Sequence, residues 1–283
     1  MLETTGTLAV PGAVLHYQVR GTGPLLLISQ SGEGDADRTA DLLTHLTDSY
    51  TVVTYDRRGL SRSRLDTPGQ GATLAEHADD VHRLLASLTD TSALMLGCSL
   101  GAVIGMHAAI RHPGQIRTLI AHEPVAPRLL PDGERACHER ELAALQDFYL
   151  REGLAAALPE IARTLGIDLA AKDAEPDLTP QPINALRAAN FDYFFRHDFT
   201  AVIHDTLDIT ALKDAATRIV PAAGRTTARN VFDYQAATAL AALLGREVQE
   251  LPGGHNGNTT HPRAYASRIR EILNAEHAPC ASG

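Results

Sequence analysis

Short runs of apolar residues alternate along this chain with longer stretches in which apolar residues recur every three or four positions. The short runs predict strands and the longer stretches predict helices, because side chains alternate across a strand but repeat about every 3.6 residues around a helix. Several strand runs are apolar throughout, which is typical of strands covered on both faces and favours a mostly parallel sheet flanked by helices. The predicted strands are residues 5–10, 13–19, 24–29, 50–56, 92–97, 117–123, 217–224 and 247–253, and the predicted helices between them are residues 36–47, 73–88, 100–111, 234–245 and 262–274.

This alternation is interrupted between about Pro127 and Asp214. The segment has two helical stretches rich in Ala and Leu, 134–152 and 153–165, and then a polar stretch with several prolines at 171–182. A helical insertion between two strands of a parallel sheet predicts a cap over the sheet edge at which such sheets bind ligands. The expected organisation is a core of residues 1–126 and 215–275, a helical cap of residues 127–214 and a flexible tail of residues 276–283.

The composition excludes some classes of partner. The chain has 283 residues, 44% of them apolar, and a formal net charge of −9. This charge argues against nucleic-acid and anionic-membrane partners, since both require clustered Lys and Arg. We find no signal-peptide pattern and no stretch long enough to span a membrane. Three scattered cysteines (98, 137 and 280) indicate reduced thiols. We therefore expect a cytoplasmic protein with a small-molecule substrate, and a homodimer is left open.

A serine flanked by glycines lies where a predicted strand meets a predicted helix. The segment Gly97-Cys98-Ser99-Leu100-Gly101 has the pattern G-x-S-x-G. A serine on such a sharp turn projects its hydroxyl above the sheet, next to helix N–H groups that favour negative charge. This pattern predicts that Ser99 is a nucleophile and that the Leu100 N–H stabilises an oxyanion. The alternative is a Gly-rich turn with a bystander serine, and Cys98 is expected to point into the core.

One of the thirteen histidines follows the last predicted strand in the loop Gly-Gly-His-Asn-Gly, residues 253–257. Glycines on both sides allow the backbone to carry the His255 imidazole over the sheet edge toward Ser99. We interpret His255 as the general base of Ser99. The alternative is a solvated loop histidine without a catalytic role.

Taken together, these motifs resemble the α/β-hydrolase superfamily over essentially the whole chain. GTGPLLLIS resembles the approach to the oxyanion loop, and YDRRGLSRS (55–63) resembles the segment D-x-R-G-x-G-x-S, with Ser61 replacing the second Gly. GCSLG resembles the nucleophile elbow and GGHNG the site of the catalytic histidine, in the chain order of the superfamily. The resemblance implies an α/β-hydrolase fold with a mostly parallel eight-stranded sheet and a helical cap insertion. The chain looks most like bacterial hydrolases with such a cap and no assigned substrate.

The resemblance also implies a triad acid shortly after the seventh strand, but residues 224–230 contain no carboxylate. A histidine base needs an anionic partner that fixes its tautomer. Glu123 ends the sixth predicted strand, where some members of the superfamily, including haloalkane dehalogenases and cofactor-free dioxygenases, carry this acid. Asp233 is the rival, at the start of a predicted helix. We favour Glu123 as the partner of His255.

The remaining site residues are expected in the loop after the third strand, in the cap and beside His255. The superfamily usually has His-Gly after the third strand, whereas this chain has Gln30 and Ser31. The Ser31 N–H is the expected second oxyanion donor, and Gln30 is an alternative donor or a substrate contact. Residues 56–58 are expected to brace the sheet end rather than to clamp a substrate. The predicted substrate-binding residues are Phe194, Phe195, His197 and Asn256.

These residues predict two-step acyl transfer on an ester-like carbonyl, in a carboxylic ester or lactone of a small, largely apolar molecule. His255, oriented by Glu123, takes the proton of Ser99, and an acyl-enzyme forms. Ser rather than Asp at the nucleophile position argues against epoxide-hydrolase and dehalogenase chemistry. No metal and no organic cofactor is expected. The alternatives are a C–C hydrolase, a thioesterase, a cofactor-free oxygenase or lyase, and a binding protein of this fold without turnover.

Overall fold

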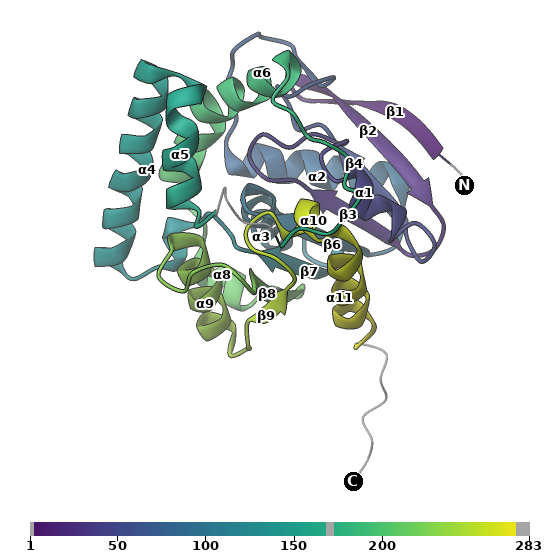
Figure 1. Cartoon of the computed structure of the whole chain (residues 1–283). Coiled ribbons are helices and arrows are strands. Elements are labelled where there is room, and N and C mark those ends of the chain that lie inside the picture. The colour runs from purple at the N-terminus through teal and green to yellow at the C-terminus, as the bar shows by residue number, and fades with distance from the viewer. Residues whose placement is uncertain (1–2, 168–172, 276–283) are drawn as a thin grey trace.

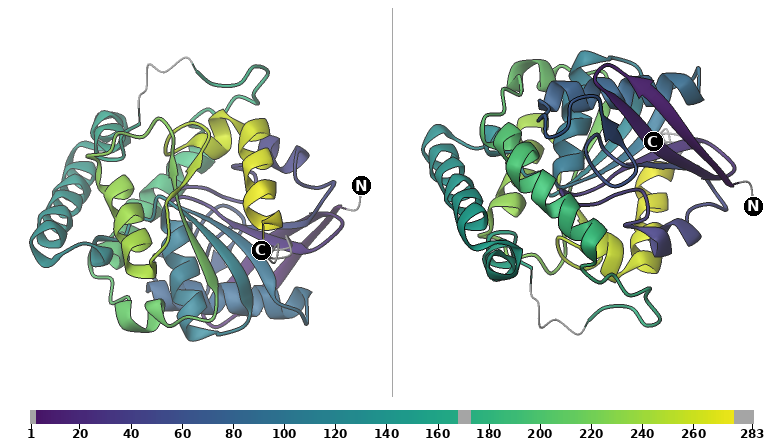
Figure 2. Two further views of the ribbon diagram at one scale, coloured as in Figure 1. Left: turned by 90° about the horizontal axis from the view of Figure 1, so that it is seen from below. Right: turned by 90° about the horizontal axis from the view of Figure 1, so that it is seen from above.

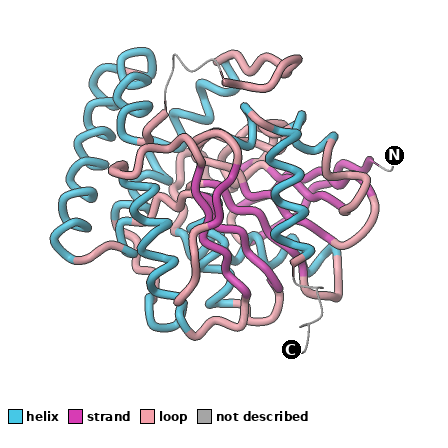
Figure 3. Tube along the Cα trace, turned by 60° about the horizontal axis from the view of Figure 1, so that its bottom comes forward, coloured by secondary structure: helices cyan, strands magenta, loops and turns pink. Residues whose placement is uncertain are grey.

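A twisted sheet runs through the middle of the molecule (Figures 1 and 3), in a computed structural model that describes residues 3–167 and 173–275. The strand order is β1-β2-β4-β3-β6-β7-β8-β9, and the short β5 pairs with β2. β1 and β2 pair antiparallel, and β2 is antiparallel to β4, whereas all pairs from β4 to β9 along this order are parallel. The strands are Glu3–Val10 (β1), Ala13–Gly21 (β2), Leu25–Ser29 (β3), Thr51–Tyr55 (β4), Arg64–Leu65 (β5), Ala93–Cys98 (β6), Ile116–His122 (β7), Arg218–Gly224 (β8) and Gln249–Leu251 (β9).

All eight strands predicted from the apolar runs are present, and the mostly parallel α/β architecture is confirmed. The ninth strand, β5, was not predicted, because two residues carry no readable periodicity. Parallel order follows from the helices between the strands, since a chain that returns in the same direction needs a crossover connection.

Helices cover both faces of the sheet (Figure 2), with α2 and α3 on one face and α1 and α11 on the other. Neighbouring strand residues serve opposite faces, as strand geometry requires. Leu27 packs in the core on the α2 and α3 side, while Leu26 and Ile28 pack against α1 and α11. The helices outside the insertion are Ala40–Thr44 (α1), Leu74–Leu88 (α2), Leu100–Arg111 (α3), Phe232–Leu244 (α9), Gly257–Thr260 (α10) and Pro262–Asn274 (α11).

The described residues between β7 and β8 form helices and loops and no strand, as the sequence predicted. The antiparallel helices α4 and α5 stand at the end of the molecule remote from β1 (Figure 1). The insertion includes a short 3-10 turn, Pro127–Leu129, and the helices Asp132–Glu152 (α4), Leu154–Thr164 (α5), Ala185–Tyr193 (α6), Phe199–Ile203 (α7) and Ile209–Lys213 (α8), with the π-helical turn Phe194–Asp198 between α6 and α7.

Two predicted segments extend beyond the described residues. The expected flexible tail, 276–283, lies outside them, as do the first two residues of the polar stretch 171–182. No helix within 3–167 and 173–275 combines the length and the apolar character that crossing a bilayer requires.

Candidate active site

Ser99 lies on the turn between β6 and α3, in a strained backbone conformation that the surrounding contacts hold in place. Its φ is 55° and its ψ is −114°, a region that costs a non-glycine residue on the order of 1–3 kcal/mol. The flanking glycines make this turn possible. A Cβ atom at Gly97 would lie 2.6 Å from the Cα of Ala102, and one at Gly101 would collide with the Ser29 carbonyl. The G-x-S-x-G spacing is therefore a steric requirement of the turn.

The turn holds Ser99 at the edge of the sheet and at the start of a helix. The Ser99 N–H donates to the His122 carbonyl at 2.8 Å, which extends the pairing of β6 with β7. Leu100 occupies the first helical position of α3, where a backbone N–H has no partner within the helix. Cys98 is buried as expected, and burial raises the pKa of its thiol to about 12. The thiol is therefore kept neutral beside the serine.

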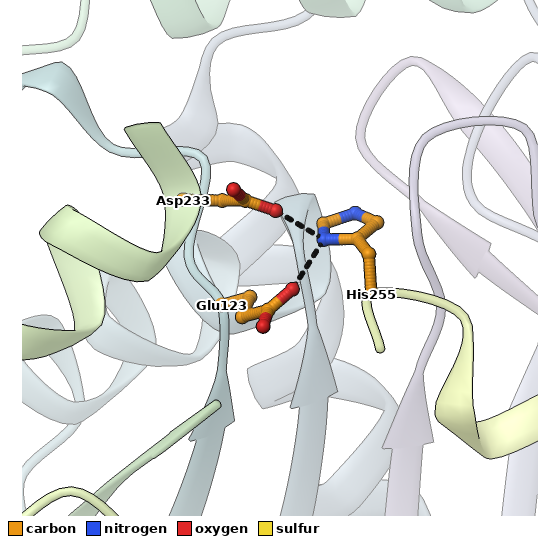
Figure 4. A group of neighbouring side chains, drawn as sticks. All are labelled: Glu123, Asp233 and His255. Carbon is orange, nitrogen blue, oxygen red and sulfur yellow. Dashed lines mark hydrogen bonds and ion pairs between the residues drawn. The ribbon is translucent and has the colours of Figure 1, made fainter. Parts of the chain in front are cut away.

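His255 lies in the loop after β9, with two carboxylates at the same ring nitrogen (Figure 4). Its Nδ1 is 2.8 Å from Oε2 of Glu123 and 2.5 Å from Oδ2 of Asp233. Glu123 directly follows β7, and Asp233 lies in the first turn of α9. Since Nδ1 is engaged by the acids, Nε2 lies on the opposite side of the ring. Two loops and the first turn of α9 therefore build this cluster at one sheet edge.

Glu123 is fixed by more than its contact with His255. It has a positive φ of 43°, its N–H donates to the Ala222 carbonyl at 2.9 Å, and it is fully buried. Its Oε1 accepts a hydrogen bond of 2.7 Å from the Gly224 N–H, while its Oε2 accepts one from His255 Nδ1. Both carboxylate oxygens are thus oriented by neighbouring groups. The expected contact of Glu123 with His255 is present in the structure.

The structure also brings Asp233, the rival carboxylate, to His255, so both candidate acids lie at the same imidazole. Helix α9 begins directly after the 225–231 loop, so its first turn faces the catalytic edge. Oδ1 of Asp233 accepts from the Tyr234 N–H at 3.1 Å. Its Oδ2 is close to Nδ1 but meets no hydrogen-bond donor with good geometry among the described residues. Asp233 therefore adds charge to the cluster, whereas Glu123 accepts the hydrogen bond.

Burial and proximity shift the three pKa values in different directions. Burial opposes the charge on His255, but Asp233 and Glu123 outweigh it and raise the pKa of the imidazole. Burial also opposes ionisation of Glu123, yet the hydrogen bond from His255 and the nearby His122 and His255 rings lower its pKa. Burial and Glu123 together raise the pKa of Asp233 despite the attraction of His255. The two carboxylates and the imidazole therefore titrate as one coupled, buried cluster.

The same three residues are donor types that could ligate a metal ion, with ligand atoms within 4.8 Å of one another. A tetrahedral divalent ion at about 2.0–2.1 Å from each ligand would hold its ligands about 3.3 Å apart. The separations of 2.5 and 2.8 Å at Nδ1 are shorter than this. The arrangement fits direct proton sharing rather than a metal centre.

Ser99 and His255 both line a cavity of about 310 Å³ between the sheet edge and the helical insertion. Of the predicted pocket residues, Phe194, Phe195 and Asn256 line this cavity, as do the predicted oxyanion residues Ser31 and Leu100. Its apolar wall comes mainly from α4, α5 and the segment from α6 to α7. That wall includes Leu142, Leu145, Leu158, Ile161, Phe191, Phe199 and Val202.

Two predicted site residues lie elsewhere. His197 lines a separate groove, and its ring packs 4.7 Å from the Tyr193 ring. Residues 194 and 195 of the π-helical turn face the cavity, whereas residue 197 of the same turn lines the other groove. The Gln30 amide is buried and donates to the Thr39 hydroxyl at 2.6 Å rather than facing the cavity.

Sequence reasoning missed the role of one buried arginine, Arg57 in the loop after β4, which contacts the loop after β3. The Arg57 guanidinium donates to the backbone carbonyls of Ser31, at 2.9 Å, of Gly32, and of Gln30, at 3.5 Å. A held carbonyl fixes the direction of the following N–H, because the peptide unit is planar. Arg57 thus orients the Ser31 N–H. The sequence predicted a bracing role for residues 56–58, and the structure specifies what Arg57 braces.

Arg57 is itself held by the helical insertion. Its Nη2 is 3.0 Å from Oδ2 of Asp198, in the π-helical turn, and the other oxygen of Asp198 is 3.2 Å from Nε2 of His77. Burial opposes the charge of Asp198, but His77 and Arg57 keep its pKa below the ordinary value. A buried ion pair therefore connects the insertion to the loop that carries the expected oxyanion donor.

With this geometry established, comparison with known proteins identifies the chain. A family model described as alpha/beta hydrolase fold matches residues 24–207. The chain is 38% identical over 280 residues, 98% of each protein, to the uncharacterized hydrolase YraK of Bacillus subtilis. These matches define a hydrolase of the α/β fold. The chain belongs to the α/β-hydrolase family, and the resemblance predicted from its motifs is confirmed.

Further relatives agree with the fold. The chain is 31% identical over 107 residues, 38% of each protein, to 2-(acetamidomethylene)succinate hydrolase of Mesorhizobium japonicum. The crystal structure of a hydrolase from Pseudomonas aeruginosa PA01 has a TM-score of 0.72 and 25% identity, and the match covers 95% of this chain and 98% of that one. An esterase from Exiguobacterium antarcticum has a TM-score of 0.75 at 16% identity, covering 96% and 99%, which shows a common fold.

Proposed function

We propose that this protein is a serine hydrolase that cleaves an ester-like bond of a small, largely apolar molecule through an acyl-enzyme on Ser99. The observation that carries the proposal is the arrangement of Ser99 and His255 on one apolar cavity, with carboxylates at the far nitrogen of the imidazole. This is the constellation that activates a serine: a nucleophile, a base, and an anion that stabilises the imidazolium.

The proposed reaction begins when the Ser99 hydroxyl attacks the substrate carbonyl carbon and His255 Nε2 takes its proton. The C=O π electrons move to oxygen, and the N–H groups of Leu100 and Ser31 stabilise the resulting oxyanion. The oxyanion collapses, the bond to the leaving alcohol breaks, and His255 returns the proton to the alcohol oxygen. Water then attacks the acyl-enzyme with His255 as base, which releases the acid and restores Ser99.

The carboxylates have separate parts in this scheme. Glu123 accepts the Nδ1–H of His255 and so keeps Nε2 unprotonated and directed away from the acids. Asp233 adds a second negative charge, which stabilises the imidazolium that forms when Ser99 attacks.

Ester and lactone chemistry is the preferred assignment among the alternatives for two reasons. The cavity wall is mostly apolar around one nucleophile, which suits an uncharged carbonyl group. Proteins with the same fold include the Exiguobacterium esterase and an enol-lactonase from Burkholderia xenovorans LB400. A cytoplasmic location and a homodimer remain predictions from the sequence.

A fluorophosphonate probe tests the proposal, because it forms an adduct only with an activated serine. We expect rapid, stoichiometric labelling at Ser99, with hydrolysis of a panel of p-nitrophenyl esters and lactones. Ser99→Ala should abolish both while the protein stays folded. Ser31→Ala is the matched control, because it removes a second hydroxyl from the cavity wall and retains the backbone N–H. Absence of labelling, or full activity in Ser99→Ala, would refute the serine mechanism.

A further inference from the structure

A second cluster of charged side chains lies in the wall of the same cavity, apart from Ser99 and His255. It consists of Glu33 and Arg38, from the loop after β3, and Arg187 from α6. The side chains are 10%, 11% and 20% exposed respectively, so all three are largely buried. Burial of this much charge is costly unless every group is paired.

Within the described residues, the pairing in this cluster is incomplete. Arg187 Nη2 is 2.7 Å from Oε1 of Glu33, and Arg38 Nε is 3.4 Å from the same oxygen. One carboxylate thus faces two guanidinium groups. The Nε atoms of both arginines are buried without a hydrogen-bond acceptor among the described residues.

Other neighbours do not supply the missing negative charge. Arg187 Nη1 donates to the Gln181 carbonyl at 2.6 Å, and Arg38 Nη1 is 3.3 Å from the Gln181 side-chain oxygen, which are both neutral groups. The nearby Asp35 carboxylate accepts instead from the Ser61 hydroxyl, at 2.7 Å, and from the Asp37 N–H. Burial and the adjacent Arg187 lower the pKa of Arg38 despite the opposing effects of Glu33 and the more distant charge of Asp35. The cluster therefore carries an excess positive charge at the wall of an apolar cavity.

We infer that Arg38 and Arg187 form a subsite for a carboxylate, and that the substrate carries a carboxylate in addition to the ester-like group cleaved at Ser99. The guanidinium group matches a carboxylate because its N–H donors form paired, charge-assisted hydrogen bonds. The apolar wall accepts the carbon chain between the two groups. This inference rests on the proposed function for the position of the cleaved bond, but the carboxylate subsite itself is testable without turnover.

The position of Glu33 predicts its effect on such a ligand. Glu33 holds the two arginines together across the boundary between the core loop and α6, but it also competes with an incoming anion for them. Removal of its charge should strengthen binding of a carboxylate, whereas removal of either arginine charge should weaken it. A cluster that served only to fasten α6 to the core would show no such opposite effects on a ligand.

The test is calorimetric binding of hexanoate and of its neutral analogue hexanamide to the wild-type protein. We expect hexanoate to bind about tenfold more tightly, the effect of a hydrogen bond to a charged group. Arg38→Gln and Arg187→Gln should each reduce this preference, and the double variant should abolish it. Glu33→Gln should increase the affinity for hexanoate and leave that for hexanamide unchanged. Arg151→Gln, at an exposed position in α4, is the control for a change in net charge.

Equal binding of the acid and the amide by the wild-type protein would overturn the inference, and so would a preference that survives in the double variant. The second result would place the carboxylate elsewhere in the cavity, for example at the oxyanion donors. A kinetic comparison extends the test to substrates: p-nitrophenyl hydrogen adipate should have a lower KM than p-nitrophenyl methyl adipate, and the double variant should remove the difference. If neither ester is hydrolysed, the proposed function fails, while the binding result still decides the subsite.

Discussion

The carboxylates of Glu123 and Asp233 reach the same nitrogen of one imidazole, although one follows β7 and the other begins α9. Each acid occupies a position that could by itself orient His255. Both acids can therefore contribute to the activity of His255. Their separate contributions can be measured by replacing them singly and together.

Glu123→Gln and Asp233→Asn are each expected to keep part of the activity, because one carboxylate remains at His255 in either variant. Glu123→Gln should be the more damaging, since it removes the hydrogen-bond acceptor that fixes the tautomer. The double variant should lose about 10⁴-fold in kcat, the scale for a histidine base without its acid. Steady-state kinetics of all three variants provides the test. If Asp233→Asn has wild-type kinetics and the kcat of Glu123→Gln is as low as that of the double variant, Asp233 has no part in catalysis.

The pH dependence should report Asp233 separately. The two acids raise the pKa of His255 in spite of burial, and a base must be neutral to accept the Ser99 proton. In the wild-type enzyme, the acid limb of the kcat/KM profile should therefore lie at a higher pH than the pKa of an ordinary histidine. Asp233→Asn lacks the charge of Asp233, so its imidazolium is less stabilised. The acid limb of this variant should therefore move down in pH, toward the ordinary histidine pKa of about 6.5.

A pH–rate profile of both enzymes checks this direction. Asp90→Asn changes the net charge by the same amount at an exposed position and should leave the limb in place. A limb that stays where it is in Asp233→Asn, or moves to higher pH, would contradict the assignment.

Asp198→Asn should impair both stability and catalysis. It leaves buried Arg57 without its counter-ion, which costs on the order of 3 kcal/mol of unfolding free energy. It also loosens Arg57 from the carbonyls that orient the Ser31 N–H, so kcat should fall. Asp80→Asn is the matched control, because Asp80 forms a similarly buried pair with Arg58, whose guanidinium donates, among the described residues, to one backbone carbonyl, that of Pro11.

The comparison requires denaturant unfolding and kcat at a temperature at which both variants are folded. Similar losses of stability with a fall in kcat only for Asp198→Asn would support coupling of the insertion to the oxyanion loop. Similar kcat values in the two variants would exclude it.

Phe194 and Phe195 are adjacent in sequence but should respond differently to truncation. Phe194 is partly exposed to the cavity, and its ring lies against Gly32, where a Cβ atom would overlap it. Phe194→Ala should therefore change selectivity among acyl chain lengths by about 1–3 kcal/mol. Phe195 is 1% exposed and stacks 4.4 Å from the Tyr149 ring, so Phe195→Ala should mainly cost stability, about 3–5 kcal/mol. A p-nitrophenyl ester series and denaturant unfolding separate the two effects, and identical responses would refute this division.

The sequence predicted the parts of the site that depend on local pattern. Ser99 was identified because its turn requires glycines at fixed spacing, and His255 because glycines flank it after a strand. Glu123 was found because the sixth strand ends at the same edge as the others. Each of these residues is placed by the element it belongs to, and the order of elements can be read from apolar periodicity.

The residues that were missed or misplaced depend on contacts between distant segments. Asp233 reaches His255 because of where α9 enters the sheet edge, which no local pattern states. His197 was expected in the cavity because it lies in the cap, but the side of the turn that faces the cavity depends on how the cap packs on the core. The pairing of Arg57 with Asp198 joins residues far apart in the chain. An arginine just after a predicted strand was the available signal, and it does not identify its partner.

The backbone strain at Ser99 has a consequence for how this protein would change under selection. Glycine adopts positive φ without penalty, so Ser99→Gly should relieve strain that Ser99→Ala retains. A screen that rewards only resistance to heat would therefore favour loss of the nucleophile. Lineages or libraries in which turnover is no longer required should drift toward glycine at this position, and its retention as serine would indicate continued use of the reaction.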